Sequence, residues 1–578
     1  MNAVAALLVV VCVSVVSAVA LAFAGSGLNP VIAWLSLISG IAAGAWQSRR
    51  CFFIQQNSVA KKTGAWEWFA IIAFVLFSLR AFCWLVFFDS DKIEVLSPNN
   101  LGDLALHVAY IRNLTNGVPF WPENPIFAGA KIHYPLGIDV FNSLLTLAGV
   151  DVWRGLVWTG LAGCALTGVA LYRWGGGFAL AGFLFNGGLA GFTFFEDLRC
   201  EDFQAELAWK SIPLAMFVTQ RGLLYAIPAG LLLLQNWRVR IFSDECGDEE
   251  KNLPPFWIEV LLYSTMPLFH LHTFLFLSML LGCWLCVAPR QREIATLIAC
   301  SLVPATILIV WVTGMFGSRS MLHLKPGWMQ GDDGFFHFWR TNFGLLPLLV
   351  LELCALIACQ WRTHRRAAAF VFPSVAIVLL CCFVMFAPWE WDNTKIMIWP
   401  YLAILPFLWA IMLARCNVWL RSGVCFALFF SGFISLFGGI DGGHTGYEIA
   451  TRFEVDGVAT AVKQLPPTAI FAAAPAYNHP LLLNGRNVVA GYPGHLWSHG
   501  IDSQHQVARL GSLLKGRGDW LEAAHELHAR YIFWGTIEKR DFSDSSQTWK
   551  KSCKIIAQGT WGKIYEVPAE GSESATPR

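Results

Sequence analysis

Residues 5–24 read AALLVVVCVSVVSAVALAFA, an apolar run with two serines and no charged residue. As a helix rising 1.5 Å per residue, a run of this length spans about 30 Å, the thickness of a bilayer's hydrocarbon core. Similar runs recur along the chain, so the sequence predicts an all-α polytopic membrane protein with about thirteen transmembrane helices. The other runs are 30–46, 66–88, 153–172, 178–195, 213–235, 256–270, 271–288, 293–315, 343–360, 367–388, 396–414 and 422–440.

Composition supports this class. Of the 578 residues, 56% are hydrophobic and 14% charged, and the mean hydropathy is +0.52, whereas soluble proteins average about 25% charged residues. These values exclude an ordinary soluble enzyme. The net charge of +2, from 41 basic and 39 acidic residues, does not indicate a nucleic-acid partner. Most of the 16 cysteines lie in apolar runs, where they act as small hydrophobic residues.

The connectors between the apolar runs alternate between basic and non-basic. Basic connectors face the cytoplasm by the positive-inside rule. The N-terminus is therefore predicted to be cytoplasmic, with 89–152, 196–212, 316–342, 389–395 and everything after 441 on the outer face. The basic connectors contain Arg49, Arg50, Lys61, Lys62, Arg173, Arg238, Arg240, Arg290, Arg292, Arg362, Arg365, Arg366, Arg415 and Arg421.

The chain divides into four predicted parts. Residues 1–65 hold two helices and a cytoplasmic loop, and 66–440 form the transmembrane core. Polar residues return in 441–568, which we expect to fold as an extracytoplasmic α/β domain, while 569–578 form a disordered tail. Five short β-rich runs of this domain are 468–473, 487–492, 531–535, 554–557 and 563–567.

The first outer loop carries a candidate catalytic pair. Asp103 and His107 are four residues apart, so a helix places both on one face, where a carboxylate can act as a base beside an imidazole. An alternative is that Asp103 caps this helix and His107 is an interfacial histidine. Further along the loop, Glu123, His133 and Tyr134 are candidate substrate-binding residues.

Two histidines occur where the chain turns between short helices. Residues 255–288 are too short for two full crossings, so we expect short or partly re-entrant helices with a break near Pro267. His270 and His272 then lie at the outer turn, with one of the two rings facing a cavity; water-bound interfacial histidines are the alternative. In the next outer loop, Arg319 and Arg340 are candidates for binding an anionic phosphate.

The segment Trp389-Glu-Trp-Asp-Asn-Thr-Lys395 lies between two apolar runs. Asp392, Asn393 and Lys395 stand where a helix begins, and a helix N-terminus attracts anions. A lysine at this point can hold a phosphate as a point charge. An aromatic belt with solvated ends is the alternative interpretation.

In these motifs the chain resembles multi-pass bacterial and archaeal glycosyltransferases of the C-type (GT-C) fold. The resemblance covers Asp-x-x-x-His from Asp103, Pro-Glu-Asn-Pro from Pro122, a proline–histidine element, Trp-Asp-Asn-Thr-Lys, and in the outer domain Gly491–Gly494 with Trp497–Gly500. It implies a polyprenyl-phosphate sugar donor that enters laterally from a bacterial plasma membrane. It also implies that Asp103 is the catalytic carboxylate, and leaves open the acceptor and a divalent cation, Mg²⁺ or Mn²⁺.

The resulting hypothesis is an inverting glycosyltransferase. Asp103 deprotonates or orients the acceptor hydroxyl, His107 positions it, and Lys395 holds the donor phosphate with Arg319 or Arg340.

Two other functions stay open at this stage. One is a transporter or flippase for a lipid-linked glycan, which predicts charged residues near helix midpoints, where Arg80, Glu259 and Glu352 are the candidates. The other is a non-catalytic assembly protein of the cell envelope.

In the outer domain, aromatic residues are suited to sugar stacking and equally to packing. They are Trp497, Tyr492, His495 and His499.

Overall fold

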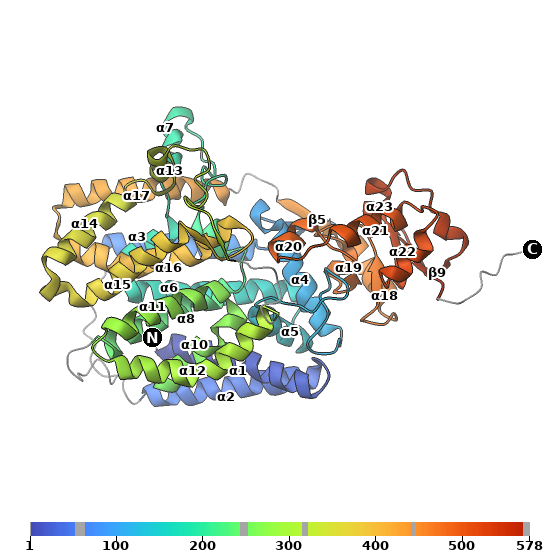
Figure 1. Ribbon diagram of the computed structural model, residues 1–578, viewed down its shortest axis with the longest axis horizontal. Helices are drawn as coiled ribbons and strands as arrows, with labels where there is room; N and C mark the ends of the chain where they lie inside the picture. Colours follow the sequence, from blue (N-terminus) through green and yellow to red (C-terminus); the bar gives the residue numbers. More distant parts are fainter. Residues whose placement is uncertain (1, 53–63, 243–252, 315–321, 441–445, 570–578) are drawn as a thin grey trace, which may run out of the picture.

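The computed structural model describes residues 2–52, 64–242, 253–314, 322–440 and 446–569. Most helices run side by side in one bundle, and the C-terminal segment forms a separate lobe at one end of it (Figure 1). The N-terminus lies within the bundle, far from this lobe.

The bundle contains helices that match the predicted apolar runs. Eight described helices, α16 being taken with the short turns around it, are long and apolar enough to cross a membrane, and α13 with α14, bent by 88°, adds a ninth. The helices of the bundle, which also include α8, α10 and α11, are α1 Asn2–Ala24, α2 Pro30–Phe52, α3 Ala65–Cys83, α6 Val152–Leu184, α8 Leu223–Arg240, α10 Phe256–Phe269, α11 Leu271–Val287, α12 Gln291–Val312, α13 Phe335–Phe343, α14 Leu346–Cys359, α15 Trp361–Cys381, α16 Thr394–Phe407 and α17 Val418–Gly439.

The expected count of about thirteen transmembrane helices is therefore only partly supported, because several apolar runs are broken. Two predicted runs join in α6, where Gly175 and Gly176 have non-helical backbone angles, and the helix ends at Leu184 although the run continues to 195. The run 213–235 starts as a π-helical turn, Ile212–Phe217, and becomes regular only in α8. Hydropathy measures apolar content, and it is insensitive to such breaks.

Helices α1 and α2 form the tightest helix pair of the bundle, and glycines make this possible. A Cβ on Gly40 would lie 2.1 Å from the Ser14 Oγ and 2.5 Å from the Val10 carbonyl oxygen. One turn on, a Cβ on Gly44 would lie 2.9 Å from the Ala6 carbonyl oxygen. Small residues four apart let two membrane helices approach closely enough for extensive van der Waals contact.

We predict that Gly40→Ala loosens this pair, because the added methyl group has no space. Overpacking costs about 1–3 kcal/mol, so the apparent melting temperature of the protein in detergent should fall by several degrees. Gly282→Ala is the matched control, since a Cβ at this α11 position meets no atom within 4 Å. Equal melting temperatures for the two variants would contradict the role of Gly40.

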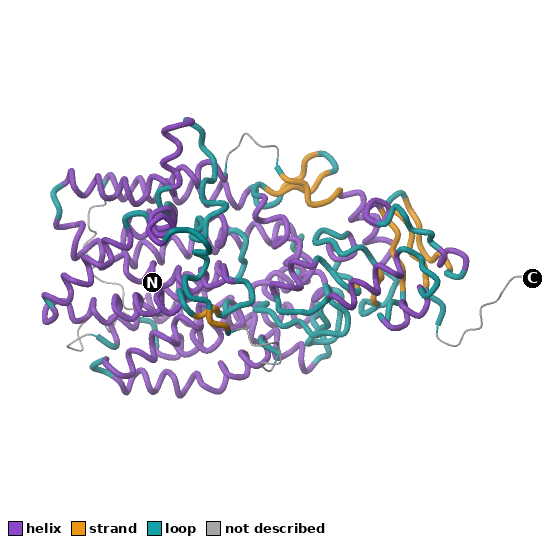
Figure 2. Tube along the Cα trace, turned by 45° about the horizontal axis from the view of Figure 1, so that its top comes forward, coloured by secondary structure: helices purple, strands orange, loops and turns teal. Residues whose placement is uncertain are grey.

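The C-terminal lobe is an α/β domain built on a five-stranded sheet of order β7-β6-β8-β10-β9, drawn in orange in Figure 2. Strand β6 runs parallel to β7 and β8, while β10 is antiparallel to β8 and β9. Each strand lies within or overlaps one of the predicted β-rich runs. The strands are β6 Ile470–Ala472, β7 Asn487–Val488, β8 Tyr531–Gly535, β9 Lys554–Gly559 and β10 Gly562–Glu566.

The helices of this domain are short and flank its sheet. Helix α20 lies on the side of the domain that faces the bundle (Figure 1), and α19 packs on α4. The helices of the domain are α18 Arg452–Val462, α19 Pro480–Leu483, α20 Pro493–Ser498, α21 Gln504–Leu514, α22 Trp520–Glu526 and α23 Thr536–Asp541.

The domain is fixed to the first outer loop by direct contacts. In α4, Leu101–Thr115, the Asn113 amide donates to the Gly485 carbonyl at 3.0 Å and to the Asn487 side-chain oxygen at 2.9 Å. A β-bridge joins Phe127 to Ala490. A second sheet, β1 Phe87–Asp89, β2 Lys92–Val95 and β5 Tyr447–Thr451, adds another attachment. These contacts set the position of α20 above α4.

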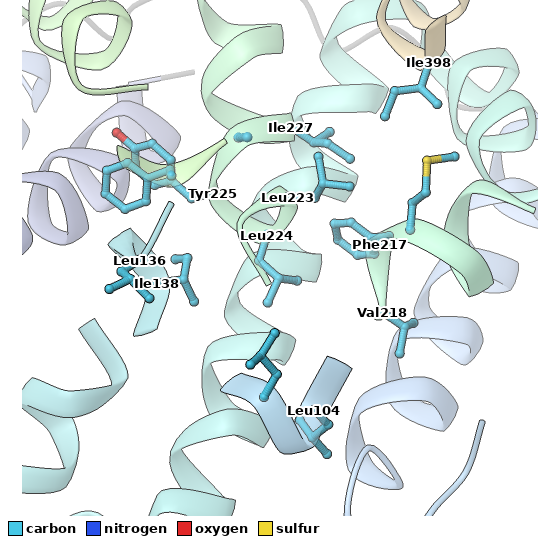
Figure 3. Close-up of a cluster of buried hydrophobic side chains, with 14 of the residues drawn as sticks. Leu104, Leu136, Ile138, Phe217, Val218, Leu223, Leu224, Tyr225, Ile227 and Ile398 are labelled. Carbon is cyan, nitrogen blue, oxygen red and sulfur yellow. The ribbon is translucent and has the colours of Figure 1, made fainter. Parts of the chain in front are cut away.

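An apolar cluster lies where α4, α5 (Gly137–Leu147) and α8 meet. Figure 3 shows Leu104, Ile138, Leu224 and Phe217 pointing into a common space. All four are at most 4% exposed. Burial of each such side chain contributes about 1.5–3 kcal/mol, so this cluster gives the polar residues beside it a rigid base.

Candidate active site

A cavity of about 400 Å³ lies between the bundle and the C-terminal domain. It is lined by residues from seven separate segments of the chain, including most of the candidate site residues that the sequence predicts. The sequence-predicted residues that line it are Asp103, His107, His133, Tyr134, His270, His272, Asp392 and Lys395.

Helix α4 presents Asp103 and His107 to this cavity. The N-cap residue of α4 is Asn100, whereas Asp103 lies inside the first turn. Both side chains therefore lie on the face that lines the cavity. Asp103 is therefore not the N-cap residue that the alternative interpretation expected.

His107 is held by a partner that the sequence analysis did not assign. Its Nδ1 lies 2.9 Å and 3.0 Å from the two carboxylate oxygens of Asp139, on α5. His107 is 3% exposed and Asp139 is 1% exposed. An ionised carboxylate can only accept, so the Nδ1–H of His107 donates; in the neutral imidazole the Nε2 is then an acceptor. The sequence signal for Asp139 was an acidic residue inside a semi-apolar stretch.

A buried arginine lies close to this pair. Arg221 is 1% exposed, and its guanidinium donates to the Leu156 carbonyl oxygen at 2.7 Å. The Asp139 carboxylate is near enough to stabilise its positive charge. Arg221 falls inside the predicted span 213–235, so the list of charged residues in spans was incomplete. The segment leaves helical geometry just before α8, which gives the side chain room to turn inward.

Two lysines form another part of the lining. Lys395 Nζ lies 2.9 Å from an Asp392 carboxylate oxygen, one turn apart at the start of α16. Lys210 Nζ lies 5.7 Å from the centre of the Trp391 ring. Lys210 comes from the outer loop 196–212, which contained no candidate in the sequence analysis.

Asn393 does not line the cavity, although the sequence places it in the same motif. It is fully buried, and its amide donates to the carbonyl oxygens of Cys381 at 2.8 Å and Val384 at 2.7 Å. Its side-chain oxygen accepts from the Phe386 N–H at 2.9 Å. Asn393 thus fixes the loop that carries Asp392 and Lys395.

Both histidines at the α10–α11 junction line the cavity, where only one ring was expected. The reason is backbone geometry: His270 is extended, with φ −159° and ψ 104°, so the two-residue spacing is not a helical one. The His270 Nδ1 lies 2.7 Å from the Thr273 hydroxyl and caps α11. The two imidazole rings are 5.5 Å apart.

The C-terminal domain completes the lining through α20 and the residue after it, with His495, Ser498 and His499. The His499 ring centre is 5.2 Å from that of Tyr134. Burial is the main cause that lowers the pKa of His499 to about 3, and the neighbouring His495 and Lys395 act in the same direction. Burial also lowers the pKa of His495. Both imidazoles are therefore neutral near pH 7.

The remaining predicted site residues lie elsewhere. Trp497 is 55% exposed and does not line the cavity, while Arg340 is exposed on α13. Glu123 forms a β-bridge with Lys131. Arg319 lies outside the described residues. A charged residue of an outer loop looks the same in a sequence whether it faces a cavity or solvent. The prediction that Arg340 binds phosphate could not make this distinction.

The described side chains contain no preformed cluster of metal ligands. Within the described ranges, no three histidine, cysteine, aspartate or glutamate side chains come together as a metal site requires. Asp139 also directs both oxygens at His107. No step proposed below is assigned to a metal.

No family model matches the chain, and no curated protein matches it. Three similar solved structures cover 88% of this chain. They are the apo oligosaccharyltransferase of Archaeoglobus fulgidus (11% identity, 75% of that chain, TM-score 0.45), AglB of the same organism with an inhibitory peptide and a dolichol-phosphate (12%, 75%, 0.41), and apo ArnT of Cupriavidus metallidurans (12%, 99%, 0.44).

The low pKa of His499 predicts acid sensitivity. Between the folded value of about 3 and the unfolded value of about 6.5, the unfolded chain binds a proton that the folded chain does not. Stability is then fully present above pH 6.5 and falls as the pH is lowered, by up to about 1.4 kcal/mol per pH unit.

We expect His499→Gln to flatten the decline of melting temperature between pH 6.5 and pH 4. His505→Gln is the control, because the His505 side chain is 69% exposed. If the melting temperature of His499→Gln falls with pH as steeply as that of the wild type, the wild-type His499 imidazole is not buried in the neutral form.

Proposed function

We propose that the protein is a membrane glycosyltransferase that moves a sugar from a polyprenyl-phosphate donor to an acceptor hydroxyl at the outer face. The observation that carries this proposal is the single cavity in which Asp103 and the His107–Asp139 pair share one lining with Lys210 and Lys395. A base and a phosphate-binding pair are the two elements that inverting transfer from a phosphate leaving group needs.

Asp103 is assigned as the base. The acceptor O–H gives its proton to the Asp103 carboxylate while the acceptor oxygen forms a bond to the anomeric carbon of the donor sugar. The Nε2 of His107 accepts a hydrogen bond from a second hydroxyl of the acceptor and so orients it, because the Nδ1–H of His107 is committed to Asp139. The C–O bond to the phosphate breaks on the opposite side, which inverts the configuration.

Lys210 and Lys395 are assigned to the phosphate. When the glycosidic bond breaks, the phosphodiester becomes a phosphomonoester and gains one negative charge, while Asp103 loses one by taking the proton. The reaction therefore moves one negative charge from Asp103 toward the phosphate. Two ammonium groups in a largely buried cavity stabilise that charge where it develops, and the N-terminus of α16 adds to this effect.

A lipid-linked donor is supported by an apolar groove beside the cavity. The groove, about 720 Å³ in volume, lies between α1 and α12 and includes Val19, Phe23 and Ile307. Phe23 is 61% exposed and Ile307 60% exposed. His133 lines both the groove and the cavity. A polyprenyl tail in the groove would thus place its phosphate at the cavity.

The charged residues that a transporter would use have other contacts. The Arg80 guanidinium donates to the Ile440 carbonyl at 3.1 Å, and Glu259 pairs with Arg240 at 3.0 Å. Glu352 is exposed on α14. These residues do not form a polar path through the bundle, so the transferase is the better-supported proposal.

We predict that Asp103→Asn lowers kcat by about 10²–10⁴-fold, the usual contribution of a positioned base. Transfer would be measured in lipid nanodiscs from a panel of radiolabelled polyprenyl-phosphate sugars, with and without EDTA. Arg340→Gln is the control and should keep wild-type transfer. Full activity of Asp103→Asn would overturn the base assignment, and no transfer from any donor by the folded wild type would overturn the proposed function.

A second prediction distinguishes a residue that orients the acceptor from one that binds the donor phosphate. Asp139→Asn releases His107 from its fixed tautomer, so kcat should fall by about 10²-fold with little change in the donor KM. Lys210→Met should instead raise the donor KM and also lower kcat, since it removes a charge that contacts the phosphate both in the bound donor and as the leaving charge develops. A raised donor KM in Asp139→Asn, with kcat unchanged, would place Asp139 in donor binding.

A further inference from the structure

His270 occupies the break between α10 and α11, and its ring is part of the lining of the candidate active site. The residue is only 6% exposed. Helix α10 packs against α12, which forms one wall of the apolar groove, and α11 packs against α16, which carries Lys395. His270 therefore joins the helix that packs beside the groove to the helix that packs beside this lysine.

The hydrogen bonds of His270 assign the position of its proton. The Nδ1 accepts from the backbone N–H of Thr273 at 3.2 Å and lies 2.7 Å from the Thr273 hydroxyl. A backbone N–H can only donate, and an imidazolium ring has no acceptor atom. The ring of His270 is therefore neutral, and its single proton is on Nε2.

This Nε2–H is a buried donor without an acceptor. Within the part of the chain that the structure describes, the nitrogen makes no hydrogen bond. Buried donors of native proteins almost always have a partner, so an exception in a cavity indicates that a ligand supplies the acceptor atom. Lys395 is near enough for its charge to act on the same ring. An anionic oxygen would satisfy the imidazole N–H and the ammonium group together.

We propose that the Nε2–H of His270 donates a hydrogen bond to a non-bridging oxygen of the donor phosphate. The assignment rests on the proposed function and adds a neutral ligand to its two lysines. The Lys395 ammonium is shared with the Asp392 carboxylate 2.9 Å away, whereas the N–H of His270 is fully available. Because its cap on α11 holds the ring in place, the N–H is oriented before the leaving charge develops on the phosphate.

A phosphate oxygen suits this N–H better than the reacting hydroxyl of the acceptor. A hydrogen bond to a charged oxygen is about twice as strong as one between neutral groups. The hydroxyl also has to reach Asp103, whose neighbour Gly102 lies against the C-terminal domain: a Cβ there would be 3.1 Å from the His495 Nε2. His270 and Lys395, in contrast, both belong to helices of the bundle.

The test measures binding of a radiolabelled polyprenyl phosphate, and of the polyprenol that lacks the phosphate, to the full-length protein in nanodiscs. His270→Asn keeps the cap, because an asparagine oxygen also accepts from the Thr273 N–H, but it removes the Nε2–H. The Kd of this variant for polyprenyl phosphate should rise roughly ten- to hundredfold, the range for a hydrogen bond to a charged group. Its Kd for the polyprenol should not change.

His270→Gln should have the opposite effects. Its side-chain amide reaches the place of Nε2 and donates there, so the Kd for polyprenyl phosphate should return close to that of the wild type, while loss of the cap lowers the melting temperature. Asn417→Ala is the control for a lost cap, since Asn417 accepts from the Leu420 N–H at 2.9 Å at the start of α17 and does not line the cavity. It should melt earlier than the wild type, with an unchanged Kd.

Three results would overturn the assignment. An unchanged Kd in His270→Asn would mean that the N–H does not contact the phosphate. An equal loss of polyprenol binding would mean that the ring shapes the site for the lipid tail. Weak binding by His270→Gln, with Asn417→Ala unaffected, would mean that the shape of the ring is needed and its N–H is not. A wild type that binds polyprenyl phosphate no better than polyprenol would instead refute the phosphate site of the proposed function, and this assignment with it.

Discussion

A bilayer offers no hydrogen-bond partner to a peptide group, so irregular backbone is stable within a membrane bundle only where protein or a water-filled cavity satisfies it. The breaks in this bundle follow that constraint. The segment before α8, the extended His270 and the loop before α16 all border the same cavity. Asn393 supplies the missing partners for the last of these with three hydrogen bonds. The apolar helices therefore stabilise the fold, and their interruptions create the site.

The same constraint explains how charges are tolerated there. Asp139 is buried, but His107 binds both of its oxygens and Arg221 balances its charge. Lys395 is paired with Asp392. An unpaired buried charge costs several kcal/mol, whereas Asp139 and Lys395 each have a partner in place. Asp103 carries no such fixed partner among the described contacts, which leaves its carboxylate available to a substrate.

The sequence predicts some of this and misses the rest for physical reasons. Apolar runs locate the helices, and the i, i+4 spacing correctly places Asp103 and His107 on one face. Asp139 is 32 residues from His107, and Lys210 is farther still from Lys395. Contacts at such separations depend on helix packing, which local patterns do not encode. The break at His270 is likewise a property of the packed bundle, and it is the reason that both rings line the cavity.

The C-terminal domain is part of the site because its position is fixed at atomic level. A Cβ on Gly102 would lie 3.1 Å from the His495 Nε2, so α20 rests almost directly on the first turn of α4. Gly485, with φ +67°, lies so close to the Arg112 backbone that a Cβ would be 2.3 Å away. Movement of the domain away from α4 would break these contacts together with the Asn113 hydrogen bonds. Asp103 therefore lies between the bundle and the domain, in the cavity that the neutral imidazoles of His495 and His499 also line.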